Sequence, residues 1–161
     1  MGTIMDIYGK KHKVIGCLGC HLRKNQIPSA GVVLGTKYFE VEQDTEIPIA
    51  AFMIIVSRRH FKGFGNLTKS EQKEFIKILA KVRKAMEKVL GIKVVYIFQN
   101  EDSTSHFHVW MFPRYKWMDK FGNKIESVRP IMEYARKKLK TKKNLEEVNK
   151  SREKLKKDLM K

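Results

Sequence analysis

The sequence predicts an α+β fold with a mostly antiparallel sheet of about five strands. Five short segments have the alternating or continuous apolar pattern of strands, and one long amphipathic helix lies between the third and the fourth of them. The short connections favour antiparallel pairing, because a parallel pair needs a long crossover. We expect the helix to pack on the sheet and a basic helical extension to follow at the C-terminus.

The first three predicted strands lie in the first 56 residues. Residues 32–34 and 38–42 follow a turn, and in the second segment Phe39 and Val41 alternate with polar positions. Residues 52–56 form a continuous apolar run that is too short for a typical helix. That run suits a strand that is buried on both faces.

The long helix has recognisable boundaries. Thr68 and Glu71 have the spacing of a capping box, in which each side chain satisfies a free backbone N–H of the other residue. Gly91 is a typical stop signal. Apolar residues recur between them at helical spacing, at Phe75, Leu79, Val82, Met86 and Leu90. We interpret this stripe as core.

The last two predicted strands are residues 93–98 and a segment that begins at His106. A short polar loop joins them, which favours antiparallel pairing. Side chains alternate along a strand, so His106, His108 and Trp110 share one face, while the apolar residues between them form a core face. The polar face carries two imidazoles, which can bind a metal, attack an electrophile or transfer protons.

Composition limits the classes of function. The chain of 161 residues has 34 Lys and Arg against 17 Asp and Glu, a formal charge of +17, and 42% hydrophobic residues. These values predict one globular domain whose field favours anionic partners, either nucleotides, nucleic acid or anionic lipid, although a generally solvated basic surface is an alternative. Residues 1–14 do not have a secretory pattern, and no segment approaches a membrane span, so we expect a cytoplasmic protein.

The C-terminal segment, residues 124–161, differs in composition. It contains 14 Lys or Arg and 6 Asp or Glu, a net charge of +8. Ser127 and Asn144 are plausible N-caps of two helices. The second helix has a thin apolar stripe, so it could dock on the domain, form a short coiled-coil seam, stay solvated, or bind nucleic acid as a basic tail.

The only two cysteines form a C-x-x-C pair. Gly19 would let the chain turn tightly so that the thiolates of Cys17 and Cys20 face one ion, which is half of a zinc site. His21 completes a c-type haem signature, but haem attachment normally follows export. A thioredoxin-like redox pair should precede a helix in a βαβ unit, whereas residues 22–28 lead into a turn.

Taken together, these parts resemble the histidine-triad (HIT) superfamily of nucleotide hydrolases and transferases. The family pattern has C-x-x-C near the N-terminus, here Cys17 and Cys20, and an Asp-bearing loop before a buried strand that ends in basic-basic-His, here Asp44 to His60. A His-φ-His-φ-His-φ-φ strand follows, where φ is apolar, here residues 106–112. The resemblance implies the HIT fold for this chain.

The resemblance also implies a metal centre. In zinc-containing members the ion is held by the two cysteines, the His after the buried strand and the first His of the triad. These positions correspond to Cys17, Cys20, His60 and His106. A closed set of four protein ligands leaves no place for a catalytic water, so we expect a structural zinc.

The implied chemistry is hydrolysis of a nucleotide substrate at its α-phosphate. By the resemblance His108 is the nucleophile, and it forms a nucleotidyl-histidine intermediate on a dinucleoside polyphosphate or a nucleotidyl phosphoramidate-like substrate. Asp44 corresponds to the acid that binds the ribose hydroxyls. Ser103 and Arg114 are candidates for phosphate contacts, and Trp110, which replaces the third triad histidine, would also contact the substrate.

Some positions depart from the family pattern. Trp110 cannot transfer a proton, and Glu101 and Asp102 precede the candidate phosphate-binding serine. An alternative function is therefore a zinc-stabilised nucleotide- or nucleic-acid-binding module with degraded catalysis. In either case we expect a HIT-like nucleotide-binding domain in residues 1–123 and a basic helical extension in residues 124–161 that is available to nucleic acid. Family members commonly form homodimers, so a homodimer is expected here.

Overall fold

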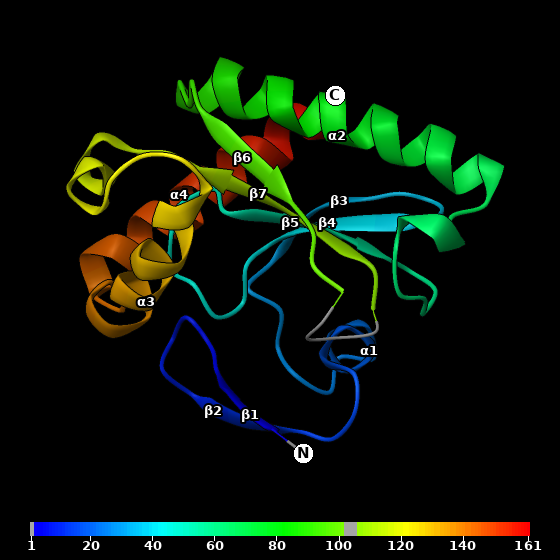
Figure 1. Cartoon of the computed structure of the whole chain (residues 1–161), viewed down its shortest axis with the longest axis horizontal. Coiled ribbons are helices and arrows are strands. Elements are labelled where there is room, and N and C mark those ends of the chain that lie inside the picture. Colours follow the sequence, from blue (N-terminus) through cyan, green and yellow to red (C-terminus); the bar gives the residue numbers. More distant parts are fainter. Residues whose placement is uncertain (1, 102–105) are drawn as a thin grey trace.

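The computed structural model describes residues 2–101 and 106–161 and shows an α+β architecture (Figure 1). Its central sheet consists of β3 (Val32–Gly35), β4 (Phe39–Gln43), β5 (Met53–Ser57), β6 (Val95–Phe98) and β7 (His108–Pro113). The strands lie in the order β3-β4-β5-β7-β6, and every neighbouring pair is antiparallel. The predicted fold class is confirmed, although β6 and β7 begin two residues later than expected.

The other elements surround this sheet. A two-stranded hairpin at the N-terminus comprises β1 (Gly2–Met5) and β2 (Lys11–Val14). The α-helices are α1 (Leu18–Arg23), α2 (Lys69–Leu90), α3 (Val128–Lys138) and α4 (Lys142–Leu159), and the 3-10 helices are η1 (Phe64–Asn66), η2 (Lys116–Phe121) and η3 (Ile125–Ser127). Within the described residues, no helix combines the length and apolar character that a bilayer crossing requires.

Helix α2 has the predicted boundaries. Thr68 Oγ1 accepts a hydrogen bond from the backbone N–H of Glu71 at 3.3 Å, and the Glu71 carboxylate accepts one from the backbone N–H of Thr68 at 2.7 Å. At the other end Gly91 has a φ of 68°, a left-handed conformation that glycine adopts without steric cost. The capping box and the glycine stop are both confirmed.

Helices α2 and α4 cover one face of the sheet (Figure 1). The buried residues of this layer include Phe39 and Val41 of β4, Val109 and Met111 of β7, Phe75 and Val82 of α2, and Leu155 and Leu159 of α4. An ion pair between Lys88 and Asp158, at 2.7 Å, also joins the two helices. Of the alternatives for the C-terminal stripe, the structure therefore supports a helix docked on the domain.

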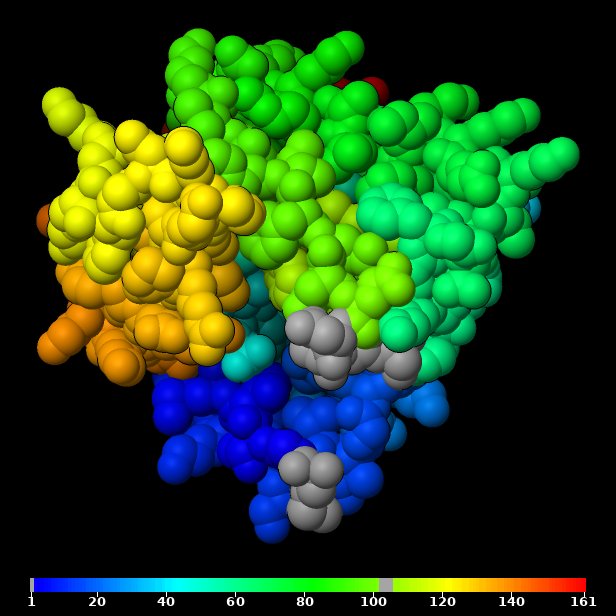
Figure 2. Space-filling model, viewed as in Figure 1, coloured from blue at the N-terminus to red at the C-terminus, as the bar shows by residue number. Residues whose placement is uncertain are grey.

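The opposite face of the sheet is bordered by α1, the β1–β2 hairpin and α3. The backbone N–H of Ile7, in the hairpin turn, donates to the carbonyl of Thr45 at 2.7 Å, and Lys140, between α3 and α4, donates to the carbonyl of Met5 at 3.3 Å. Figure 2 shows the N-terminal residues in blue beside the yellow and orange C-terminal segment. Both ends of the chain thus help to enclose this face.

Of the two predicted N-caps of the C-terminal helices, Ser127 has the predicted position and Asn144 is wrong. Ser127 is the N-cap residue of α3, but its hydroxyl donates to the carbonyl of Lys124 at 2.7 Å and makes no capping hydrogen bond. The cap of α4 is Thr141, whose hydroxyl accepts from the backbone N–H of Asn144 at 3.3 Å. The Asn144 amide instead donates to the carbonyl of Pro48 at 2.6 Å, which attaches α4 to the loop before β5.

Candidate active site and metal centre

Strand β7 and the residue before it present alternate side chains to the two faces of the sheet. Phe107, Val109 and Met111 are fully buried beneath α2 and α4. His108 and Trp110 are half-buried on the opposite face. The alternation predicted from the sequence is confirmed, and it delivers one imidazole and one indole to the same surface.

The four predicted metal ligands come together in one cluster. The Sγ atoms of Cys17 and Cys20 and one ring nitrogen each of His60 and His106 all lie within 4.8 Å of one another. Cys20 Sγ is 3.2 Å from His60 Nδ1 and 3.5 Å from His106 Nδ1, and Cys17 Sγ is 3.3 Å from His106 Nδ1. The two cysteines lie at the start of α1. His60 lies in the segment after β5, and His106 lies two residues before β7.

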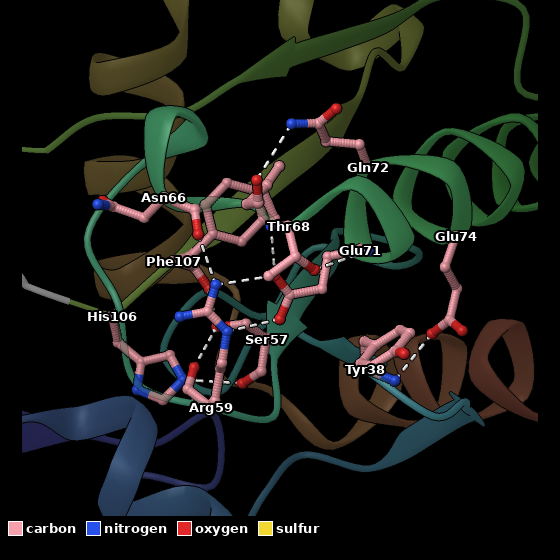
Figure 3. A network of polar contacts seen from close by, with 11 residues as sticks. Tyr38, Ser57, Arg59, Asn66, Thr68, Glu71, Gln72, Glu74, His106 and Phe107 are labelled. Carbon is pink, nitrogen blue, oxygen red and sulfur yellow. Dashed lines mark hydrogen bonds and ion pairs between the residues drawn. The ribbon is translucent and has the colours of Figure 1, made fainter.

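His106 is oriented for metal binding by a backbone contact. Its Nε2 atom lies 2.8 Å from the carbonyl oxygen of Ser57, so this nitrogen carries the proton and donates it (Figure 3). The lone pair of Nδ1 therefore faces the two thiols. Burial lowers the pKa of His106, which favours the neutral imidazole that a metal requires.

The geometry of the cluster fits a zinc ion. With the usual Zn–S and Zn–N bond lengths, a tetrahedral site has S···N separations of about 3.6 Å. The observed separations of 3.2, 3.3 and 3.5 Å are within a few tenths of an ångström of that value. Burial and the neighbouring Cys17 thiol raise the pKa of Cys20, and a bound cation would offset this penalty by stabilising both thiolates.

The reason for Gly19 differs from the one we predicted. The C-x-x-C pair lies at the start of helix α1, and Gly19 does not adopt a left-handed conformation. A Cβ atom at Gly19 would instead lie 2.7 Å from His106 Cγ, so glycine allows α1 to approach the histidine ring closely. His21 is not part of the Cys₂His₂ cluster, and its side chain hydrogen-bonds the backbone carbonyl of Ile15. Helix α1 follows the antiparallel β1–β2 hairpin, which differs from the βαβ unit of a thioredoxin-like redox pair.

A polar network attaches the His60 segment to α2 (Figure 3). Arg59 forms two hydrogen bonds to the Glu71 carboxylate, at 2.6 and 2.8 Å, and its guanidinium lies 4.0 Å from the ring centre of Phe61. The ion pair with Arg59 lowers the pKa of Glu71 to about 2. The same carboxylate therefore caps α2 and holds Arg59, the residue next to His60 of the Cys₂His₂ cluster.

His108 is held as a neutral imidazole with one free nitrogen. Its Nδ1 atom donates to the carbonyl oxygen of His106 at 2.8 Å. Burial lowers the pKa of His108, so the ring stays unprotonated near neutral pH. In the described part of the chain no hydrogen bond occupies Nε2, and His108 lines a cavity. This arrangement leaves a nucleophilic lone pair available.

The cavity has a volume of about 520 Å³, within the range of small-molecule sites. Its walls are the exposed face of the sheet, α1, the β1–β2 hairpin and α3. Its lining includes His108 and Trp110 of β7, Ile54 and Val56 of β5, Glu42 of β4, Asp44 and Thr45 after β4, Leu18 and Leu22 of α1, and Arg136 of α3.

Asp44 lines the same cavity as His108, and its predicted role toward a substrate stays a prediction. It is only 6% exposed, and its Oδ1 atom accepts hydrogen bonds from the backbone N–H groups of Glu46 and Ile47 at 2.8 and 2.7 Å. Burial raises its pKa to about 6, and the nearby Arg136 acts in the opposite direction. The second carboxylate oxygen remains available to a ligand, since no hydrogen bond to Oδ2 is seen among residues 2–101 and 106–161.

Trp110 lies two residues beyond His108 on the same face of β7, and its side chain contacts two neighbouring rings. Its ring centre is 4.4 Å from that of His108, at 86°, and 5.2 Å from that of Phe98. The edge-to-face contact buries one side of the imidazole without supplying a proton acceptor. Trp110 thus shapes the cavity beside the free nitrogen of His108.

The structure does not bring Arg114 to the cavity, so the predicted phosphate contact is corrected. Its guanidinium donates to Ser127 Oγ and to the carbonyl of Gly122, each at 3.0 Å, and pairs with Asp119 at 3.3 Å. The side chain is 7% exposed and holds the segment between β7 and α3 together. Ser103 lies outside the described residues, so its role stays a prediction.

Sequence reasoning missed several polar residues of the cavity, among them Glu42, Thr45 and Arg136. Glu42 lies two residues before Asp44 and therefore shares its side of the chain, so strand alternation could have identified it. Arg136 belongs to the C-terminal segment, which shows no sequence signal for a contact with the sheet. The β1–β2 hairpin, which also lines the cavity, was not predicted.

Searches of the sequence against models of protein families and against curated proteins find no match. Solved structures, in contrast, share this fold. A hypothetical histidine triad nucleotide-binding protein from Sulfolobus tokodaii superposes with a TM-score of 0.65 at 14% identity, over 89% of this chain and 92% of that chain. A zinc-bound histidine triad family protein from Mycobacterium smegmatis has a TM-score of 0.61 at 14% identity, over 86% and 92%.

A third similar structure is a HIT family hydrolase from Clostridium thermocellum, with a TM-score of 0.52 at 20% identity, over 70% of this chain and 99% of that chain. At these identities the comparison establishes the fold. The chain therefore has the fold of histidine triad proteins, and it contains a Cys₂His₂ cluster that could bind a metal.

Proposed function

We propose that this chain is a nucleotide hydrolase of the histidine-triad superfamily, with His108 as its nucleophile. The observation that carries the proposal is the orientation of His108, whose Nδ1–H is held by the His106 carbonyl while Nε2 is free at the cavity. The size of the cavity, about 520 Å³, suits a nucleotide. The fold shared with a histidine triad hydrolase supports the same reaction class.

The reaction has two steps. The Nε2 lone pair of His108 forms a bond to the α-phosphorus, and the bond from that phosphorus to the leaving group breaks, so the leaving group takes the electron pair. Water then attacks the nucleotidyl-histidine intermediate, which releases a nucleoside monophosphate and regenerates the imidazole. The His106 carbonyl accepts a hydrogen bond from Nδ1–H of His108, and this contact stabilises the positive charge on the imidazole ring in the nucleotidyl-histidine intermediate.

Trp110 narrows the substrate class. An amine leaving group must gain a proton as it departs, and the indole has only one N–H donor, which it cannot exchange as an imidazole can. A polyphosphate is a stable anion and can leave without that proton. We therefore favour a dinucleoside polyphosphate over a phosphoramidate, with Asp44 binding the ribose hydroxyls through its open oxygen and Ser103 contacting phosphate.

A zinc ion held by Cys17, Cys20, His60 and His106 would have a structural role. Its four protein ligands form a closed set, so the ion would supply rigidity and no open coordination position. It would fix α1 to the residue that precedes the nucleophile strand. The carbonyl of His106, which orients His108, would be positioned by the same ion.

Turnover of a dinucleoside tetraphosphate by wild-type protein and by His108→Ala tests the proposal. We expect the variant to lose at least a thousandfold in kcat, with unchanged zinc content and melting temperature. His21→Ala is the matched control, because His21 lies outside both the cavity and the metal cluster, and it should retain activity. Wild-type rates in His108→Ala would refute the mechanism.

A second function, nucleic-acid binding, is favoured by the outer face of α4. Its exposed residues include Lys142, Lys143, Lys150, Lys154 and Lys157, whereas its apolar face is buried. Replacement of these lysines by glutamine should leave the fold intact. If α4 binds single-stranded RNA, the affinity of wild-type protein for RNA will fall steeply as the salt concentration rises. The affinity of the variant will depend less on salt concentration.

We also propose a homodimer that forms through the β6 edge of the sheet. An edge strand has unpaired backbone groups, and here Val94, just before β6, and Ile97, within it, are 49% and 47% exposed. Light scattering of the wild-type protein should give twice the monomer mass. The Ile97→Lys variant should give a mass closer to that of the monomer. A wild-type monomer at 100 µM would contradict this arrangement.

A further inference from the structure

One wall of the cavity contains a buried carboxyl group without a cationic partner. Glu42 is 5% exposed, and within residues 2–101 and 106–161 no Lys, Arg or His forms an ion pair with it. Burial raises its pKa to about 7. An uncompensated carboxyl in such a place is costly for stability, so its presence on a cavity wall indicates a role toward a ligand.

The register of the sheet places Glu42 relative to the proposed active site. Glu42 pairs with Ile54, and Ile54 pairs with Trp110, so the three residues form one row across β4, β5 and β7. Strands are about 4.8 Å apart, so Glu42 and Trp110 are separated by roughly 10 Å with Ile54 between them. Leu18 and Leu22 of α1 also line this cavity. These apolar side chains form walls that suit a flat ring, with Glu42 at its edge.

Two further features indicate that this part of the cavity is built for polar contacts. Thr45 is 5% exposed and lines the cavity, and its Oγ1 atom has no hydrogen-bond partner in the described part of the chain. Ser29 accepts from the backbone N–H of Gly31 at 3.1 Å and donates to Glu42 Oε2 at 2.7 Å. The carboxyl group is thus oriented, and its Oε1 atom remains open to a ligand.

We infer that Glu42 is a specificity residue that selects guanine nucleotides by accepting hydrogen bonds from the base. The inference rests on the proposed nucleotide hydrolase function. Asp44, the proposed ribose ligand, lies two residues beyond Glu42, about 7 Å along the chain. A base is bonded directly to its ribose, so it reaches Glu42 when the ribose is at Asp44.

The choice of guanine follows from the donors that each base presents. Above its pKa of about 7 the Glu42 carboxyl group is ionised and only accepts hydrogen bonds. Guanine alone has two adjacent N–H donors on one edge, at N1 and N2. These match the two oxygens of the carboxylate, because Oε1 is open and Oε2, which accepts from Ser29, can accept a second hydrogen bond. Adenine places its N1 lone pair there, cytosine its N3 lone pair, and uracil has one N–H between two carbonyl groups. Each of these bases leaves at least one carboxylate oxygen facing another acceptor.

Calorimetric binding of GMP and AMP tests the inference without turnover. We expect wild-type protein to bind GMP at least tenfold more tightly than AMP, and Glu42→Gln to reduce this ratio to threefold or less, since glutamine turns one acceptor into a donor. Glu40→Gln is the matched control, because Glu40 lies on the same strand but pairs with Arg58 outside the cavity. It should preserve the ratio.

The outcomes separate this inference from the proposed function. Hydrolysis of both diadenosine and diguanosine tetraphosphate with no guanine preference would overturn the role of Glu42 and leave His108 as the nucleophile. An adenine preference in wild-type protein, or a guanine preference that persists in Glu42→Gln, would also overturn it. Failure to bind or cleave any nucleotide would refute both proposals. The ratio of GMP to AMP affinity is measured first on the wild-type protein alone. A folding defect in Glu42→Gln therefore cannot obscure that result.

Discussion

At the level of single residues, the Cys₂His₂ cluster and the position of His108 on the polar face of its strand were predictable because their spacing in the sequence is unusual. Cys17, Cys20, His60 and His106 meet as expected. Arg114 was not predictable, because an arginine after a strand can turn toward either side, and here a set of acceptors between β7 and α3 binds it. The direction of a long charged side chain depends on such tertiary partners.

Gly19→Ala tests the close contact between α1 and His106. The new methyl group would lie 2.7 Å from His106 Cγ, and that ring cannot retreat easily because Ser57 holds its other side. We expect a lower zinc affinity and a melting temperature several degrees lower. Zinc titration with a competing chelator measures the first effect. A variant that binds zinc as tightly as wild type would show that the contact is dispensable.

Glu71→Gln tests the ion pair beside the metal ligand. The pKa of Glu71 is near 2 in the folded state and near 4.5 when unfolded, so the folded protein binds fewer protons at this group. The ion pair with Arg59 therefore stabilises the fold above pH 4.5, and this stabilisation is lost as the pH falls from 4.5 toward 2. Because Arg59 is half-exposed, we expect a contribution of about 1–3 kcal/mol.

Urea unfolding of wild type and Glu71→Gln between pH 2 and pH 7 measures this contribution. The difference in unfolding free energy should be largest at neutral pH and should shrink below pH 4.5. A difference that stays constant down to pH 2 would mean that the side chain acts only through packing or through the helix cap.

At the level of elements, local signals predicted helix boundaries well where the cap is made within the helix. The Thr68 capping box and Gly91 are such cases. Asn144 was misassigned because its amide binds the carbonyl of Pro48, a contact between distant segments, and Thr141 takes the cap. The short helix α1 was missed because it has only six residues and no side-chain cap, so it has no local sequence signal.

Helix α4 is expected to be part of the core and not a removable tail. Leu155 is fully buried against α2 and the sheet. Leu155→Ala should lower the free energy of unfolding by about 2–5 kcal/mol, through lost burial and the cavity left behind. Lys154→Ala, on the exposed side of the same helix, should change it by less than about 0.5 kcal/mol. Equal effects of the two variants in urea unfolding would contradict the docked arrangement.

At the level of the whole molecule, the cavity is assembled from parts that are far apart in the sequence. The hairpin at the N-terminus, α1, the sheet and α3 each contribute a wall. Strand periodicity predicted the sheet face but could not predict which segments would cover it. Arg136 and the hairpin were missed for this reason, whereas Glu42 was overlooked although strand alternation placed it beside Asp44.

Removal of zinc tests whether the metal centre stabilises the entire fold. The four ligands join α1, the end of β5 and the start of β7, so the ion would close two long loops of the chain. Dialysis against a strong chelator should lower the melting temperature by about 10 °C or more, and added zinc should restore it. Purified protein without zinc, and with a melting temperature insensitive to chelator, would refute the structural zinc.

The central claim is that Nε2 of His108 carries a nucleotidyl group during turnover. The most direct measurement is mass spectrometry of protein that is mixed with a dinucleoside tetraphosphate and quenched within milliseconds in alkali, where a phosphorus–nitrogen bond survives. We expect a mass increase of one nucleotidyl group on the peptide that contains His108, absent from His108→Ala. Full turnover with no adduct, or an adduct on another residue, would contradict it.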